Sequence, residues 1–299
     1  MNARAKSAAT IRRLAAGFIA ASLLCAAANS ARAAGPACGP AIASCGCIIA
    51  KPGIYKITQD LLASQGLLPN GDCLDIKASH VTLLTDGYAM TGAGTGIGLH
   101  VLKGSKQDFV EGVKGKTSQA AQNFTTFSAW DIGVKWEGGN GILEDFQANE
   151  NASVGVMLNR AGGNNINDYS ALNNGVYGVW LQASSGNQIN CSNARRNGNT
   201  GVYLGCSPSG PSGAGCKGVA PSNNNRIYDT DSFFSASDAN GAYGIAIDAG
   251  NGGNIVTENR SKFNPSGDLF DNNPNCGTNL WIGNNFDSVA PPANAGCLK

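Results

Sequence analysis

The sequence predicts an all-β solenoid, in which short parallel strands stack coil upon coil. The chain has 299 residues, of which 41 are glycine and only 14% are charged. This composition disfavours long helices, because glycine costs about 1 kcal/mol per helical position relative to alanine. Short runs alternate apolar and polar residues with period 2, which indicates strands. A motif also recurs about every 23 residues, a spacing typical of solenoids.

Each repeat begins with a glycine that precedes alternating apolar residues. The six glycines are Gly96, Gly133, Gly155, Gly178, Gly201 and Gly244. From Gly133 onward the spacings are 22, 23, 23 and 43 residues, so the last coil is expected to carry an insertion around residues 207–222. A second set of apolar positions runs between them, with Asn-rich turns, at Ile142, Ile166, Ile189, Ile227 and Ile255. Together these patterns predict a single domain of about eight or nine coils.

The first 33 residues are expected to be a Sec-type secretory signal peptide. A basic start precedes an apolar run at 14–28, and Ala31-Arg32-Ala33 fits the cleavage rule. The run is shorter than the roughly 20 residues that a membrane span needs. Without this leader the chain carries 16 basic and 20 acidic residues. We therefore expect a secreted or periplasmic protein with no membrane span in its mature form and, since it lacks a basic cluster, no nucleic-acid partner.

Nine cysteines remain after residue 33, and an exported protein can keep them as disulfides. Cys206 and Cys216 bracket a Gly/Pro/Ser-rich segment, and Cys276 and Cys297 bracket the C-terminus. Four more, which allow three connectivities, are Cys38, Cys45, Cys47 and Cys73. Cys191 is left as a free thiol. Residues 34–70 and 265–299 are therefore expected to be disulfide-stapled caps on coils spanning 71–264, since open solenoid ends need capping.

Residues 51–61 read Lys-Pro-Gly-Ile-Tyr-Lys-Ile-Thr-Gln-Asp-Leu, and Thr91-Gly92 and Gly94 follow a Val-Thr-Leu strand at 81–83. These segments resemble the opening coils of the right-handed parallel β-helix proteins of the pectin-lyase-like superfamily. The resemblance covers roughly residues 45–290 and implies a single-stranded right-handed parallel β-helix. It says little about activity, because this superfamily includes lyases, hydrolases, epimerases, adhesins and binding proteins.

Stacked coils align equivalent residues into columns on the outer face. Two residues after each glycine stand Gly98, Lys135, Met157, Trp180, Tyr203 and Ala246; four residues after it stand His100, Glu137, Asn159, Gln182, Gly205 and Asp248. Trp180 and Tyr203 suit stacking on sugar rings, with Gln182, Asn159 and Asp248 as polar partners. The alternative is that a loop, residues 207–222 or 103–130, covers both rings.

Acidic residues recur two positions after the isoleucines, where Asp168 and Asp229 align and Asp231 is adjacent. Carboxylates on neighbouring coils would lie about 5 Å apart, a spacing that suits Ca²⁺ or a glycosidase pair. Simple alternation turns this column inward, where Cys191 fits and carboxylates do not. Either a turn intervenes or these carboxylates cap turn amides. Calcium is the one cofactor that the sequence suggests.

Motifs of known enzymes of this fold are absent: the chain has neither the Asp-Asp and Gly-His-Gly of polygalacturonase-like hydrolases nor the Asp-Pro-His-Asp of alginate-epimerase-like proteins. A lyase needs a base for the proton next to a uronate carboxyl group and a cation for that carboxyl. The candidates on the outer face are Lys135, Glu137, Arg160 and His100, and also Tyr203. The leading hypothesis is an exported protein that binds or cleaves a glycan there. The alternatives are a non-catalytic surface module or adhesin, and an isomerase or cyclase of a smaller molecule.

Overall fold

The computed structural model describes a single unit that starts at Gly35. Its described residues are 35–298 without 113–123, 191, 210, 212–215, 217, 229–238, 292–293 and 295. The expected signal peptide and Cys191 lie outside the described residues. In the described part the regular structure is 26 strands and two 3₁₀ turns, η1 (Ala63–Gln65) and η2 (Pro274–Cys276). No helix in the described ranges has the length and apolar character that crossing a membrane requires.

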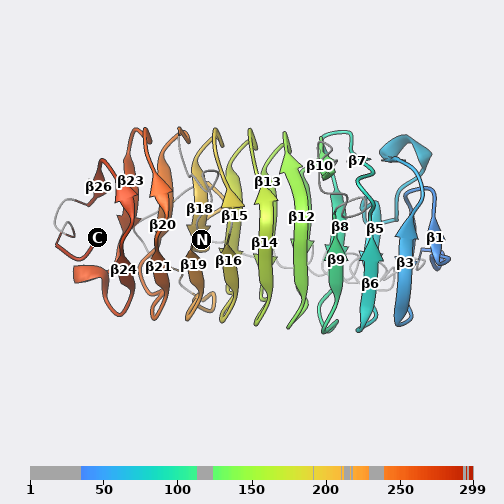
Figure 1. Ribbon diagram of the computed structural model, residues 1–299, viewed down its shortest axis with the longest axis horizontal. Coiled ribbons are helices and arrows are strands. Elements are labelled where there is room, and N and C mark those ends of the chain that lie inside the picture. Colours follow the sequence, from blue (N-terminus) through green and yellow to red (C-terminus); the bar gives the residue numbers. More distant parts are fainter. Residues whose placement is uncertain are drawn as a thin grey trace, which may run out of the picture. The chain divides into compact units, whose positions relative to one another are not determined.

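Two large parallel sheets run the length of this unit, and each coil contributes strands to both. Figure 1 shows the coils following one another in sequence order, from β1 in blue to β26 in red. The ten-stranded sheet contains, in spatial order, β2 (Cys47–Ile49), β5 (Leu74–Ile76), β8 (Ile97–Val101), β11 (Ile132–Trp136), β13 (Val154–Asn159), β15 (Tyr177–Gln182), β18 (Thr200–Leu204), β20 (Tyr243–Ile247), β23 (Gly267–Asp271) and β26 (Val289–Ala290). The parallel β-solenoid predicted from the repeat is thereby confirmed.

The second sheet has fourteen strands. Its main path is β1 (Ala41–Ile42), β3 (Gly53–Ile57), β6 (Val81–Leu84), β9 (Phe109–Glu111), β12 (Ile142–Asn149), β14 (Asn165–Ser170), β16 (Gln188–Asn190), β19 (Arg226–Tyr228), β21 (Ile255–Thr257) and β24 (Leu280–Ile282). Beside this path lie β4 (Leu61–Leu62), β7 (Met90–Thr91), β10 (Thr125–Ser128) and β17 (Ser192–Asn193). A separate pair is formed by β22 (Arg260–Ser261) and β25 (Asn285–Phe286).

The solenoid interior is a set of apolar columns, one residue per coil. Val134, Val156 and Val179 pair in register, and all three are fully buried. Val202 pairs directly with Ile245, so the 43-residue spacing is a single coil that carries extra residues, as expected. Burial of such aliphatic side chains contributes about 1.5–3 kcal/mol each, which makes these columns the main source of stability.

The register corrects two of the sequence alignments by a small shift. Leu99 pairs with Val134, so Gly98 rather than Gly96 corresponds to Gly133. In the other sheet Leu143 and Val256 occupy the inward column, whereas Ile142 and Ile255 are exposed. Alternating patterns fix a strand's period but not its register where two adjacent residues are both apolar.

Asparagines between the strands, where turns were predicted, also form two buried ladders. In one of them the Asn174 side-chain oxygen accepts from the Asn151 backbone and side chain, both at 3.0 Å, and Asn197 repeats the arrangement one coil on. A Cβ at Gly155 would lie 2.8 Å from Asn174 Nδ2. The repeating glycine therefore leaves room for the ladder amide. The two ladders are Asn151–Asn174–Asn197–Asn240–Asn264 and Asn164–Asn187–Asn225–Asn254–Asn279.

Four disulfides are present. Two of them were expected, Cys206–Cys216 and Cys276–Cys297, and the latter lies at the C-terminal end. At the other end Cys38–Cys47 and Cys45–Cys73 select one of the three possible connectivities. Both ends of the solenoid are therefore stapled, as predicted.

Candidate functional site

The outer face of the ten-stranded sheet carries the predicted column and divides into two halves. In register along it stand Asp75, His100, Lys135, Met157, Trp180, Tyr203, Ala246 and Phe270. We call Asp75, His100 and Lys135, together with Glu137 and Asn159, the polar half. We call the part from Met157 onward, with Tyr177, the aromatic half. Because Gly98 is the true counterpart of Gly133, His100 stands in the column of Lys135 and not, as expected from the sequence, in the column of Glu137.

The aromatic half is a second hydrophobic core on the outside of the sheet. Tyr177, Trp180 and Tyr203 pack together, with the Tyr177 and Tyr203 ring centroids 4.8 Å apart. Trp180 is 7% exposed and Tyr203 is fully buried. The open sugar platform expected from the sequence is therefore wrong for this structure, and the alternative of a covered face applies.

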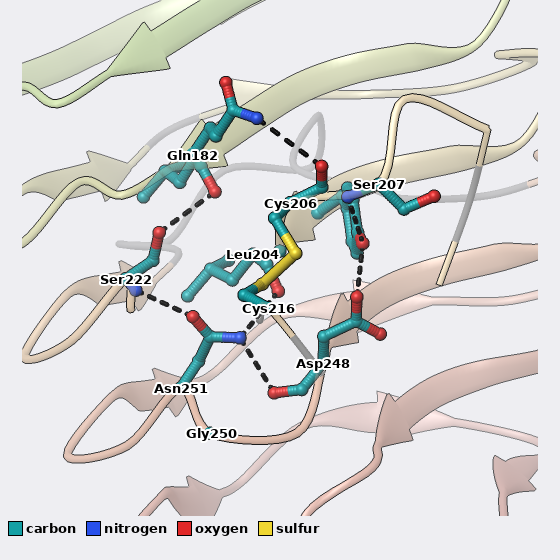
Figure 2. Close-up of a disulfide and its surroundings, with 12 residues drawn as sticks. Gln182, Leu204, Cys206, Ser207, Cys216, Ser222, Asp248, Gly250 and Asn251 are labelled. Atoms are coloured by element: carbon teal, nitrogen blue, oxygen red, sulfur yellow. Dashed lines mark hydrogen bonds between the residues drawn. A yellow bond between two sulfur atoms is a disulfide. The ribbon is translucent and has the colours of Figure 1, made fainter. Parts of the chain in front are cut away.

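The cover is the segment that follows β18. Trp180 Nε1 donates to the Gly205 carbonyl at 2.8 Å, and the Tyr177 hydroxyl donates to the Ser207 carbonyl at 2.7 Å. Figure 2 shows the Cys206–Cys216 disulfide in this region, with the Gln182 amide directed at the Cys206 carbonyl, 3.4 Å away. The polar edges of the rings are thus bonded to the chain itself, which leaves them no free group for a sugar.

Asp248, another predicted site residue, is also buried in this packing, where it contacts Tyr203. The Tyr203 hydroxyl donates to Asp248, whose side chain is fully buried. Burial, together with this hydrogen bond to a carboxylate, raises the pKa of Tyr203 far above that of a free tyrosine. Tyr203 therefore does not supply a base, and Asp248 does not meet a ligand from solvent.

The polar half brings four of the predicted residues into one hydrogen-bonded group. His100 Nε2 lies 3.3 Å from Glu137 Oε2, while Lys135 Nζ lies 3.1 Å from Glu137 Oε1. Asn159 Nδ2 donates to the same Oε1 at 2.7 Å. Glu137 is thus the centre of the group, with one partner on each adjoining coil. Burial opposes its ionisation, but Lys135 and His100 outweigh burial and hold the pKa of Glu137 below its usual value.

The sequence reasoning missed the two aspartates that complete this group. Asp72 Oδ2 lies 2.8 Å from His100 Nδ1, and Asp75 stands opposite His100 on β5. Burial, and then the charge of Asp72, raises the pKa of Asp75 to about 6. A signal was present, because Asp75 is the outward residue between inward Leu74 and Ile76. It was missed because no repeat glycine marks this coil.

Two sets of residues bring metal-ligating atoms within 4.8 Å of one another in the described ranges. One is Cys206, Cys216 and Asp248, but disulfide-bonded sulfurs are not thiolate ligands. The other is Asp72, Asp75 and His100, all three buried.

The calcium site expected at Asp168, Asp229 and Asp231 is not tested, because Asp229 and Asp231 lie outside the described residues. Asp168 is exposed and accepts a hydrogen bond from Asn167 at 3.1 Å. Its φ of 47°, like the φ of 57° at Asp145, is left-handed, although the two residues lie inside strands β14 and β12. The left-handed residue interrupts the alternation that would have turned the Asp168 side chain into the core.

Arg160, the remaining candidate, follows the end of β13 and is exposed. It lies next to Asn159, which pairs with Gln182 on the following coil. Both Asn159 and Gln182 are partly exposed, so the border of the polar half is open to solvent at this position.

The fold and this face define the chain as a parallel β-solenoid protein with a polar cluster on one outer sheet. No family model matches the chain, and no curated protein matches its sequence. A solved structure with a similar course of the chain is a double mutant of the periplasmic alginate epimerase AlgG. It has a TM-score of 0.39 and 13% sequence identity, and the match covers 80% of this chain and 75% of that one.

Proposed function

We propose that the protein is exported and binds an acidic glycan along the open border of the polar half. The observation that carries this proposal is the row formed by Glu137, Asn159 and Gln182, which occupy one position on three successive coils. Successive coils are about 4.8 Å apart, so the row offers carboxylate and amide groups at a regular spacing. Disulfides are typical of exported proteins, which supports the export part of the proposal.

The charges beside this row favour a glycan that carries carboxylates. Lys135 is one-fifth exposed, and Arg160 is exposed one residue after Asn159. An arginine pairs with a carboxylate through two parallel hydrogen bonds. A uronate unit fits this pattern, because its hydroxyls suit the amides and its carboxylate suits the two cations.

Binding without cleavage is better supported than lyase chemistry. A lyase needs a group free to accept the proton next to the uronate carboxyl. Both ring nitrogens of His100 already lie against carboxylates, and Glu137 already accepts from Asn159 and Lys135. Tyr203 is buried. Among the described residues of this face, therefore, no base stands ready beside Lys135 and Arg160.

The test is to measure binding of polygalacturonate, alginate and neutral dextran by calorimetry. We expect the two uronate polymers to bind and dextran not to, and Lys135→Gln with Arg160→Gln to weaken binding about tenfold or more. Lys262→Gln, which removes a cation paired with Asp287 elsewhere, should leave affinity unchanged. If neither uronate polymer binds, the proposal fails. A rise in ultraviolet absorbance from unsaturated product would instead establish the lyase.

A further inference from the structure

We propose that Asp72, Asp75 and His100 bind one divalent transition-metal ion, with Zn²⁺ the best match to this ligand set. The three side chains present an imidazole nitrogen and two carboxylate oxygens within 4.8 Å of one another. Ligand atoms around a tetrahedral zinc lie roughly 3.4 Å apart, given bonds of about 2.1 Å. Small side-chain rotations therefore suffice to bring all three onto one ion.

The buried carboxylate of Asp75 indicates that the cluster is incomplete without a cation. Asp75 is 4% exposed and Asp72 is 3% exposed. Asp75 Oδ2 accepts from Asn70 at 3.2 Å, but its Oδ1 is buried and has no hydrogen-bond partner in the described structure. Buried carboxylates are normally paired or bound to a metal. Lys135, the lysine of this half, bonds Glu137 and not either aspartate.

The surroundings of His100 match those of a metal-ligating histidine. Such a histidine donates its second ring nitrogen to a carboxylate or carbonyl, which fixes the ring and its tautomer. His100 Nδ1 faces Asp72, and Nε2 lies 3.3 Å from Glu137. Glu137 is in turn fixed by Asn159 and Lys135. The three ligands would then form an inner layer of the polar half. Glu137, Asn159 and Lys135 would form an outer layer that fixes the orientation of His100.

The backbone holds these ligands rigidly. Asp75 and His100 stand in register on adjacent strands, and Asp72 precedes Cys73, which is bonded to Cys45. The choice of ion follows from the donors. Calcium takes six to eight oxygen ligands, whereas an imidazole with two carboxylates suits zinc. This inference does not depend on the proposed glycan binding.

The test uses the purified chain with its disulfides intact, its free thiols alkylated and its metals removed by chelation. At a free Zn²⁺ concentration a hundredfold above Kd we expect Tm to rise by roughly 5 °C. The same concentration of Ca²⁺ should change Tm by less than about 1 °C, because three ligands are too few for it. Elemental mass spectrometry of the zinc-loaded protein should find one zinc ion per chain.

Asp75→Asn, and independently Asp72→Asn, should abolish both the bound zinc and the shift in Tm. Asp168→Asn is the matched control, because Asp168 is exposed, and it should keep both. Without metal, Asp75→Asn should be no less stable than the wild type, since it removes one of two adjacent buried carboxylates. The proposal is overturned if the wild type binds no zinc, if Ca²⁺ stabilises it equally, or if Asp75→Asn keeps the zinc shift.

Discussion

The polar and aromatic halves lie on one sheet with one register, but their outward side chains are buried by different kinds of contact. His100 and Trp180 occupy the same column, and both are more than nine-tenths buried. In the aromatic half burial is achieved by ring stacking and by the segment after β18. In the polar half the buried His100 is hydrogen-bonded to the carboxylates of Asp72 and Glu137. The comparison teaches that an outward position on a solenoid is not an exposed one, and that chemistry must be sought where burial leaves polar atoms unsatisfied.

The pKa values of two buried aspartates express the same contrast. Asp75, in the polar half, accepts from Asn70, and burial beside Asp72 raises its pKa to about 6. Asp268 precedes Phe270 in the aromatic half. Burial also disfavours its charge, but hydrogen bonds from the N–H groups of Asn264 and Asp287 and from the Ser288 hydroxyl outweigh burial and lower its pKa. Asp75 accepts a hydrogen bond from one residue, whereas Asp268 accepts hydrogen bonds from three.

The largest expected effect is that of Trp180→Ala, which tests whether the ring is buried in the aromatic half. Removing a buried tryptophan should lower the free energy of unfolding by about 3–5 kcal/mol, as measured by urea denaturation. Trp180→Phe keeps one aromatic ring and loses the hydrogen bond to Gly205 and part of the buried ring volume, so its cost should be smaller. Binding of glycan at the polar half should survive in both variants. Unchanged stability of Trp180→Ala would restore the open platform.

The next largest effect concerns the asparagine ladder that runs from Asn151 to Asn264. Asn197→Ala leaves the Asn174 backbone N–H and the Ala171 carbonyl without their partners, at an expected cost of about 2–4 kcal/mol in unfolding free energy. Asn174→Ala, one coil nearer the polar half, should cost the same. Gln188→Ala, an exposed amide, should change stability by less than about 0.5 kcal/mol. A clear difference between the two ladder variants would contradict the expectation that each coil of the ladder contributes equally to stability.

The smallest expected effect is in acid. The folded pKa of Asp268 is lowered, so its ionised form contributes stability above the ordinary value of about 4, and this contribution is lost as the pH falls towards the folded pKa. Asp268→Asn should therefore lose less stability than the wild type between about pH 6 and about pH 3, as measured by urea midpoints. Equal losses in the two proteins would show that the N–H donors around Asp268 do not act on its charge.

Much of the candidate site could be predicted from the sequence. Lys135, Glu137 and Asn159 were correctly placed on one outer face, because alternation and a fixed repeat determine which way a side chain points. His100 was placed one column away from its true position, since Gly96 and Gly98 both fit the repeat. Asp72 and Asp75 were missed because their coil has no marker glycine. Burial of Trp180 was left open, because no pattern along the chain reveals what folds over it.

The sequence by itself determined the solenoid, its coil length and the direction of most side chains, because these follow from local periodicity and from glycines that admit the Asn ladder. Only the tertiary structure decided the register, the disulfide connectivity at the N-terminal end and the burial of each outward residue. Register and burial depend on contacts between neighbouring coils, which join residues about 23 to 45 positions apart, such as Asn174 with Asn197 and Tyr203 with Asp248. Contacts of that range depend on how coils and insertions meet in space, which periodicity along the chain does not encode.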